Sequence, residues 1–125
     1  MRLLYVTQYL ARNDEPGANR QWDLLQALAG RGHRADVIIS GQHYLGGARS
    51  AGAPGREAWA GGTFFRLRGL PGYRKSFARR AANYLYFAAQ ALLLALRLRG
   101  YDVVLASTPS PFVGLVGWVA ARRNR

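Results

Sequence analysis

The chain contains no cysteine and only six acidic residues among 125, and these shortages exclude several classes of protein. Without cysteine there is neither a disulfide framework nor a thiolate metal site. The acidic residues form no Asp-x-Asp pair and no other metal-ligand spacing, so we expect no metal ion. They are Asp14, Glu15, Asp23, Asp36, Glu57 and Asp102. A glycine-rich phosphate loop ending in Lys-Ser/Thr and a nucleophile elbow are also missing, which leaves ATP hydrolysis and serine-esterase chemistry without support.

Long apolar runs are missing as well. The N-terminal stretch 1–8 has too short an apolar run for a signal peptide, so we expect a cytoplasmic protein. The apolar stretch 81–96 contains Asn83 and Gln90 and is shorter than the roughly 20 residues that a spanning helix needs. Three interpretations stay open: a core helix whose N-terminal end touches a membrane, a plain core helix, or a helix inserted in the membrane.

What the chain has in excess is positive charge, with a formal net charge of +12. Such charge favours polyanionic partners, either lipid headgroups or nucleic acid. One basic cluster contains an aromatic residue and directly precedes the apolar stretch 81–96, a combination that suits the surface of an anionic membrane. We therefore predict a membrane-facing surface made of Tyr73, Arg74, Lys75, Arg79 and Arg80.

The first forty residues predict a βαβ unit. The run 3–6 is short, apolar and flanked by polar residues, which is typical of a strand buried in a parallel sheet. Pro16 and Gly17 interrupt the chain before a helix predicted over 18–31. A second strand at 36–39 follows, and a strand returning across one helix is normally parallel. The pattern predicts an α/β fold, with a Rossmann-like parallel sheet and flanking helices.

The rest of the chain extends this pattern. Residues 41–61 are rich in glycine and poor in large apolar side chains, so we predict a long flexible loop. Strands are predicted at 62–68 and 102–107. A last helix is predicted to begin at Pro111, with Ser110 as its N-cap.

The candidate binding residues lie where strands end and helices begin. A helix N-terminus directs free N–H groups into the crevice at the carboxyl ends of the strands, where anionic ligands bind. The candidates are Gly17, Ala18, Asn19, Arg20, His43, Thr108, Pro109 and Ser110. Structural roles remain open for each: a tight turn for the first group, an exposed loop histidine, and helix capping at the last positions. No catalytic residue is identified.

Several segments, in this order, resemble one known family: 5–9, the loop reaching Gly17, 19–24, 27–29, 31–33, 70–80 and 101–111. Their sequences are similar to the N-terminal domain of bacterial family 4 glycosyltransferases. The resemblance covers nearly the whole chain, except for a variable region around 41–61. The family often has paired glycines at the first helix, and here Ala18 stands in the second place.

The resemblance implies an incomplete N-terminal, acceptor-side half of a GT-B fold, with the C-terminal nucleotide-sugar domain absent from these 125 residues. It further implies retaining, metal-independent transfer, without a cofactor, from a nucleotide sugar to a polyprenyl-diphosphate-linked saccharide. That reaction builds cell-surface polysaccharide at the inner face of the plasma membrane. We expect the fragment alone to be inactive. The alternative is a small basic module that binds nucleic acid or anionic membrane without catalysis, or an inactive remnant.

Overall fold

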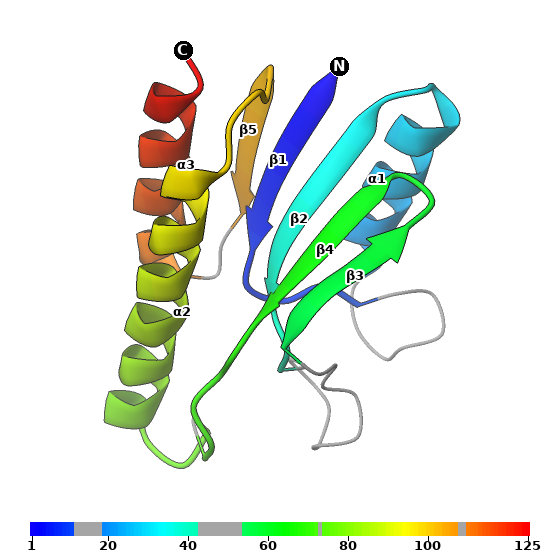
Figure 1. Cartoon of the computed structure of the whole chain (residues 1–125). Coiled ribbons are helices and arrows are strands. Elements are labelled where there is room, and N and C mark those ends of the chain that lie inside the picture. The colour runs from blue at the N-terminus through cyan, green and yellow to red at the C-terminus, as the bar shows by residue number, and fades with distance from the viewer. Residues whose placement is uncertain (12–18, 43–53, 73, 108–109) are drawn as a thin grey trace.

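A computed structural model describes residues 1–11, 19–42, 54–72, 74–107 and 110–125 of the chain. Its elements form one sheet with helices on both faces (Figure 1). In chain order they are β1 (Arg2–Thr7), α1 (Arg20–Gly30), β2 (Arg34–Ser40), β3 (Gly55–Trp59), β4 (Gly62–Leu67), α2 (Phe77–Arg97), β5 (Val103–Ser107) and α3 (Pro111–Arg123). The strand order is β3-β4-β2-β1-β5, and only β3 runs antiparallel to its neighbour. This is an α/β, Rossmann-like fold.

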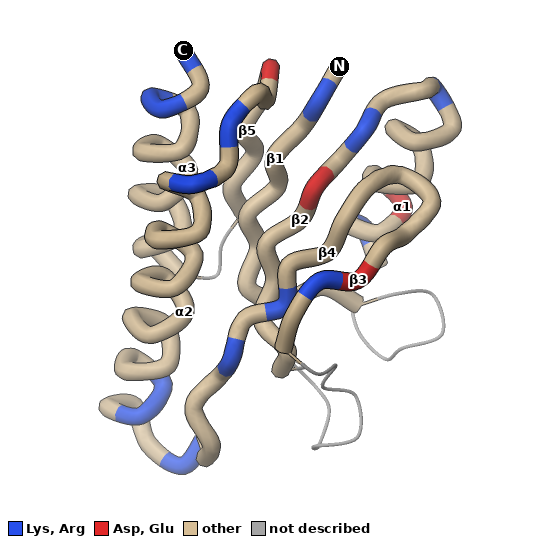
Figure 2. The backbone as a smooth tube through the Cα atoms, in the orientation of Figure 1, with Lys and Arg blue, Asp and Glu red and all other residues tan. Residues whose placement is uncertain are grey.

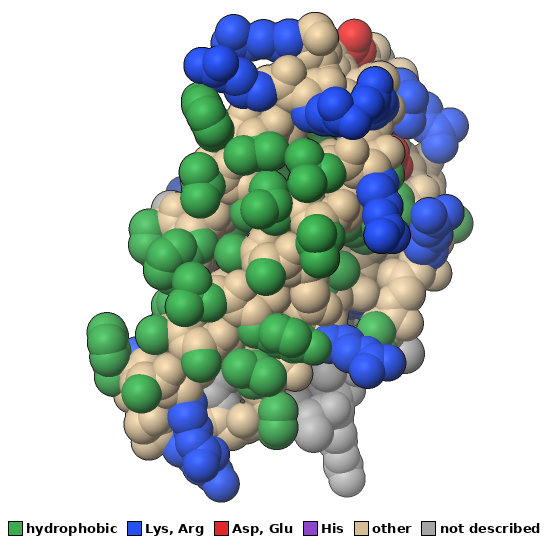
Figure 3. All heavy atoms as spheres, turned by 60° about the vertical axis from the view of Figure 1, so that its left-hand side comes forward, with side chains coloured by type: hydrophobic (Ala, Val, Ile, Leu, Met, Phe, Trp, Pro, Cys, Tyr) green, Lys and Arg blue, Asp and Glu red, His purple; other side chains and the backbone are tan. Residues whose placement is uncertain are grey.

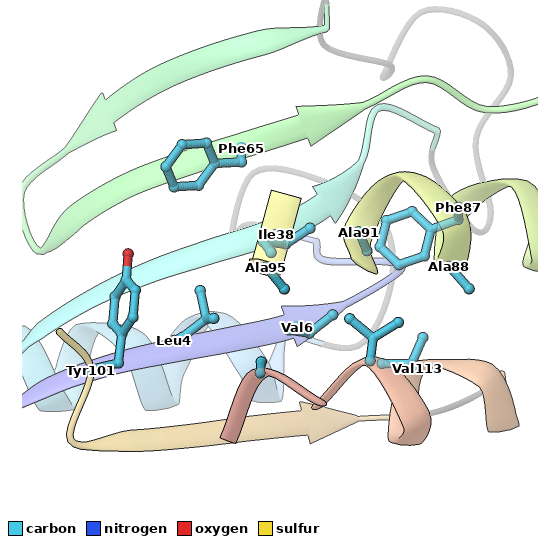
Figure 4. Packing of buried hydrophobic residues seen from close by; sticks show 12 residues of the cluster. Leu4, Val6, Ile38, Phe65, Phe87, Ala88, Ala91, Ala95, Tyr101 and Val113 are labelled. Atoms are coloured by element: carbon cyan, nitrogen blue, oxygen red, sulfur yellow. The ribbon is translucent and has the colours of Figure 1, made fainter. Parts of the chain in front are cut away.

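The strand β1 lies inside the sheet, and its residues from Leu3 to Thr7 are all buried. Successive side chains of a strand point to opposite faces, so β1 supplies two separate cores. On one face Tyr5 packs with Leu25 of α1 and with Phe64 of β4. On the other face Leu4 and Val6 pack with residues of α2 and α3, as Figure 4 shows.

The chain reverses its direction of travel across the sheet at β1. The helix α1 connects β1 to β2 on one face, and α2 then connects β4 to β5 on the opposite face. As a result β5 pairs with the free side of β1, with Thr7 opposite Ser107. The junction of β1 and β5 is a topological switch point, the position at which open α/β sheets bind ligands.

The predicted strands at 3–6, 36–39, 62–68 and 102–107 and the predicted helices are confirmed, with ends shifted by a few residues. The prediction of a loop over 41–61 is wrong in its last part, because Gly55–Trp59 forms β3. Residues 43–53 of that range lie outside the described residues. The sheet is therefore mixed and not wholly parallel.

Side-chain contacts hold the strand β3 in the sheet, although the segment 41–61 that contains it is rich in glycine. The ring of Trp59 stacks on Phe64 at 5.6 Å between centroids and contacts Trp22 at 5.5 Å. Its indole N–H donates to the carbonyl of Ala35 at 3.2 Å. At the far end of the hairpin, the Arg66 guanidinium lies 2.8 Å from Glu57.

The apolar stretch 81–96 lies within α2, which packs against the sheet through Phe87, Ala91 and Ala95. This arrangement confirms a helix that covers the core. Within the described part of the chain, no helix is long and apolar enough to cross a membrane.

Two glycines of α3 provide a matched test of this packing. A Cβ at Gly117 would lie 2.6 Å from the Cβ of Ala106 on β5, whereas a Cβ at Gly114 meets nothing within 4 Å. We expect Gly117→Ala to lower the free energy of unfolding by about 1–3 kcal/mol, because helix and strand must separate. The control Gly114→Ala should raise it by about 0.5–1 kcal/mol. Urea unfolding measures both, and equal effects would contradict the close contact.

A polar cluster closes the opposite, N-terminal edge of the sheet. The Tyr101 hydroxyl donates to Asp36 Oδ2 at 2.7 Å, and Asp36 Oδ1 accepts from the backbone N–H of Thr63 at 2.9 Å. The Arg2 guanidinium lies 4.9 Å from the centre of the Tyr101 ring. Burial, followed by the hydrogen bond to Asp36 and its negative charge, raises the pKa of Tyr101 far above its ordinary value.

This shift predicts how stability depends on alkaline pH. Above pH 10 an unfolded tyrosine loses its proton while the folded Tyr101 keeps it, so the unfolded state binds fewer protons and stability falls as pH rises. Below that pH the contribution is fully present. We expect Tyr101→Phe to lose roughly 1 kcal/mol at pH 8 and to show a shallower decline between pH 9 and 11. The control is Tyr86→Phe, at an exposed side chain. Parallel stability curves for wild type and Tyr101→Phe would contradict the assignment.

Candidate functional site

Three hydroxyl groups form a chain at the carboxyl ends of β1 and β5, where Figure 1 shows the two strands side by side. The Ser107 Oγ lies 3.0 Å from the Tyr5 hydroxyl and donates to Thr7 Oγ1 at 2.9 Å. Thr7 Oγ1 in turn donates to the carbonyl of Tyr9 at 3.3 Å. These bonds connect the two strands at the switch point through side chains as well as through the sheet.

The helix α1 begins at the same edge, because it runs back along the sheet from the end of β1. The first N–H groups of a helix have no partner within the helix and carry a partial positive charge. Asn19 is the N-cap residue, yet its side chain makes no capping hydrogen bond. The Arg20 side chain is exposed beside it. This end of α1 therefore offers N–H donors and the Arg20 cation, with the exposed Asp23 carboxylate in the same first turn as an opposing charge.

Among the described residues at the carboxyl-end edge of the sheet, four side-chain oxygens are buried and have no hydrogen-bond partner. They are Gln8 Oε1, Asn19 Oδ1, Gln21 Oε1 and Ser110 Oγ. Gln8 directly follows β1, Asn19 and Gln21 begin α1, and Ser110 begins α3. Gln8 and Ser110 have no exposed surface at all. Buried polar groups in folded proteins are nearly always paired, so a group of unpaired oxygens at one edge indicates a place for a ligand. We call these four the orphan oxygens.

The arrangement defines the chemistry of a ligand. The amide oxygens among the orphan oxygens accept hydrogen bonds, so they suit a molecule with several hydroxyl donors. The N-terminus of α1 and Arg20 favour an anion, above all a phosphate. A polyhydroxylated, phosphate-bearing molecule meets both demands.

The predicted site residues fall into two groups. Asn19, Arg20 and Ser110 lie at this edge, at the starts of α1 and α3. Gly17, Ala18, His43, Thr108 and Pro109 lie outside the described residues. Pro111 occupies the first turn of α3 as predicted, but the Ser110 hydroxyl makes no capping bond.

Four polar residues of the edge are missing from the sequence-based candidates: Tyr5, Thr7, Gln8 and Gln21. A signal for two of them exists, because Thr7 and Gln8 are the first polar residues after the buried run of β1. Polar residues at the end of a central parallel strand are placed at the ligand-binding edge.

The predicted membrane-facing residues are exposed where the structure describes them. Arg74 and Lys75 precede α2, and Arg79 and Arg80 lie in its first turns (Figure 2). Tyr73 lies outside the described residues. Among the residues that are placed, no three His, Cys, Asp or Glu side chains come together as a group that holds a metal ion.

Fold and site together define an α/β protein with a Rossmann-like sheet and a polar switch point. Comparisons with protein-family models, with curated proteins and with solved structures find no match to this chain.

The two serine N-caps provide a test of the orphan oxygens. Ser76 Oγ accepts from the backbone N–H of Arg79 at 3.1 Å, whereas Ser110 Oγ is buried without a partner. We expect Ser76→Ala to cost about 1 kcal/mol of stability, and Ser110→Ala to change it by no more than about 0.5 kcal/mol. Thermal unfolding of both variants measures the difference. A loss at Ser110 equal to that at Ser76 would show that its hydroxyl caps α3.

Proposed function

We propose that this chain is the acceptor-side domain of a family 4 glycosyltransferase, which transfers a sugar from a nucleotide sugar to a lipid-linked saccharide. The observation that carries the proposal is the group of orphan oxygens at the carboxyl-end edge of the sheet, with Asn19 and Gln21 at the N-terminus of α1. Hydrogen-bond acceptors for hydroxyls next to donors for a phosphate are what a saccharide diphosphate requires. The ordered resemblance described above supports the same reaction class.

In this proposal each part of the edge has one role. The amide oxygens of Gln8 and Gln21 accept hydrogen bonds from sugar hydroxyls, and Arg20 with the first N–H groups of α1 binds phosphate. The hydroxyl chain from Tyr5 to Thr7 fixes the ends of β1 and β5, so that these groups keep their positions. Rigid positioning of the acceptor accounts for a large part of the rate of a transfer reaction.

The transfer itself needs a second domain facing this edge. The proposal assigns the binding of the nucleotide sugar to that domain, together with the acidic motif that the family carries there. The described residues then orient the acceptor and exclude water, and none of them is assigned as the catalytic acid or base.

A transfer assay tests the proposal. The longest product of the reading frame that contains this chain is incubated with a panel of nucleotide sugars and polyprenyl-diphosphate saccharides, and labelled lipid product is measured. We expect transfer from one donor, and a loss of tenfold or more in kcat/KM, about 1.4 kcal/mol of transition-state binding, for Gln8→Met and for Arg20→Ala. The control Arg31→Ala changes an exposed arginine at the other end of α1 and should leave the rate unchanged.

The variant Gln8→Met separates function from folding. It replaces a buried amide, whose oxygen is unpaired and whose Nε2 donates to the Tyr9 hydroxyl at 3.4 Å, with an apolar side chain of similar shape, so stability should change by no more than about 1 kcal/mol. A stable Gln8→Met protein with full activity would contradict the assigned role. Absence of transfer from every donor, together with saturable and salt-sensitive binding of DNA, would instead support the basic binding module.

A further inference from the structure

The outer surface of α2 and α3 is apolar, although both helices pack on the core through their other side. The exposed large side chains on these helices are Phe77, Leu85, Tyr86, Leu93, Leu96, Leu115 and Trp118. Leu93 is 63% exposed, and Leu115 and Trp118 are 57% and 56% exposed. Figure 3 shows hydrophobic side chains gathered across this side of the molecule. We call this surface the helical face.

The helical face is continuous because the two helices pack side by side. Leu85, Leu93 and Leu96 are spaced to lie on one side of α2, and Leu115 and Trp118 are three residues apart on α3. The chain has no charged residue between Arg80 and Arg97, or between Asp102 and Arg122. Large exposed apolar patches of this kind mark interaction sites.

The exposed charges at the ends of the two helices are mostly positive, and Asp102, in the connection between α2 and β5, is an exposed acid beside them. Neither α2 nor α3 contains an acidic residue. The exposed cations at the ends of the two helices are Lys75, Arg79, Arg80, Arg97, Arg99, Arg122 and Arg123. The Arg122 guanidinium lies 4.8 Å from the ring centre of Trp118, so a cation and an aromatic ring occupy the edge of the face together.

The first turns of α2 carry a charge that the helix itself disfavours. A helix N-terminus is positively polarised, and acidic residues are stabilising there. The first turn of α2 contains no acidic residue, and Arg79 occupies its third position after the Ser76 N-cap. Local stability does not explain arginine at this position, whereas an external anion does.

We propose that the helical face lies flat on an anionic lipid bilayer, with its leucines and Trp118 among the acyl chains and its arginines at the phosphate level. Both helices then lie in the plane of the membrane and neither crosses it, in keeping with a large apolar surface and a basic rim. The mainly cationic rim disfavours a second copy as the partner, because two such rims repel each other. The apolar centre of the helical face does not suit nucleic acid as the partner, because nucleic acid binds to cations distributed across the contact surface.

Binding to vesicles tests the proposal without any sugar substrate, so the result does not depend on the proposed function. The whole chain is co-sedimented with phosphatidylcholine vesicles that contain, or lack, phosphatidylglycerol. We expect binding to the anionic vesicles only. The triple substitution Leu93→Gln, Leu115→Gln and Trp118→Gln should weaken it at least tenfold. The control Leu24→Gln changes an exposed leucine of α1, on the opposite face of the sheet, and should bind as the wild type does.

A second variant rules out damage to the fold. Arg79→Glu places an acid at the third position after Ser76, which completes a capping box and suits the helix dipole. We expect its Tm to rise while its binding to anionic vesicles falls several-fold. The control Arg34→Glu makes the same change of charge at an exposed position on β2 and should bind more tightly than Arg79→Glu.

Quenching of tryptophan fluorescence by brominated lipid locates the contact. Trp118 is the exposed tryptophan of α3, whereas Trp22 and Trp59 pack in the core on the other face. We expect quenching in the wild type that Trp118→Phe removes while binding persists. Undiminished binding of the triple variant would overturn the proposal. So would equal binding to vesicles without phosphatidylglycerol, or a dimer in solution that the triple variant dissociates.

Discussion

The structure depends on the burial of β1 from Leu3 to Thr7. A parallel strand with both faces covered must pair on both sides and supply side chains to two cores, and β1 does so between β2 and β5. Because β2 and β5 are reached by connections on opposite faces, this burial also creates the switch point. The position of the candidate site therefore follows from the strand order and packing of the sheet.

Elements with strong patterns could be predicted from the sequence, and elements without them could not. The buried runs of β1 and β2 and the proline at the start of α3 place those elements to within a few residues. The strand β3 could not be predicted, because it contains glycine and alanine and has little periodicity. Its stability comes from Trp59, which packs on residues distant in sequence. Short edge strands carry little periodicity, and their stability comes from tertiary contacts.

Some residues of the candidate site could likewise be predicted from the sequence, and others could not. Asn19, Arg20 and Ser110 could be predicted because helix starts have a recognisable chemistry. The burial of the Oε1 atoms of Gln8 and Gln21 without partners has no counterpart in a linear pattern, since it depends on what the fold places around them. On α2 the sequence shows a helix that is apolar on nearly all sides, but only the sheet decides which side faces the core and which side stays exposed.

The basic side chains at the rim of the helical face are almost all arginines. Lys75 is the single lysine of the chain, and every other cation on the rim of the helical face is arginine. Guanidinium groups keep their proton at any physiological pH and are not substrates for lysine acetylation. Lysine acetylation can therefore remove only the charge of Lys75 from this rim, and the attraction of the arginines for an anionic surface is governed by ionic strength and by the composition of that surface.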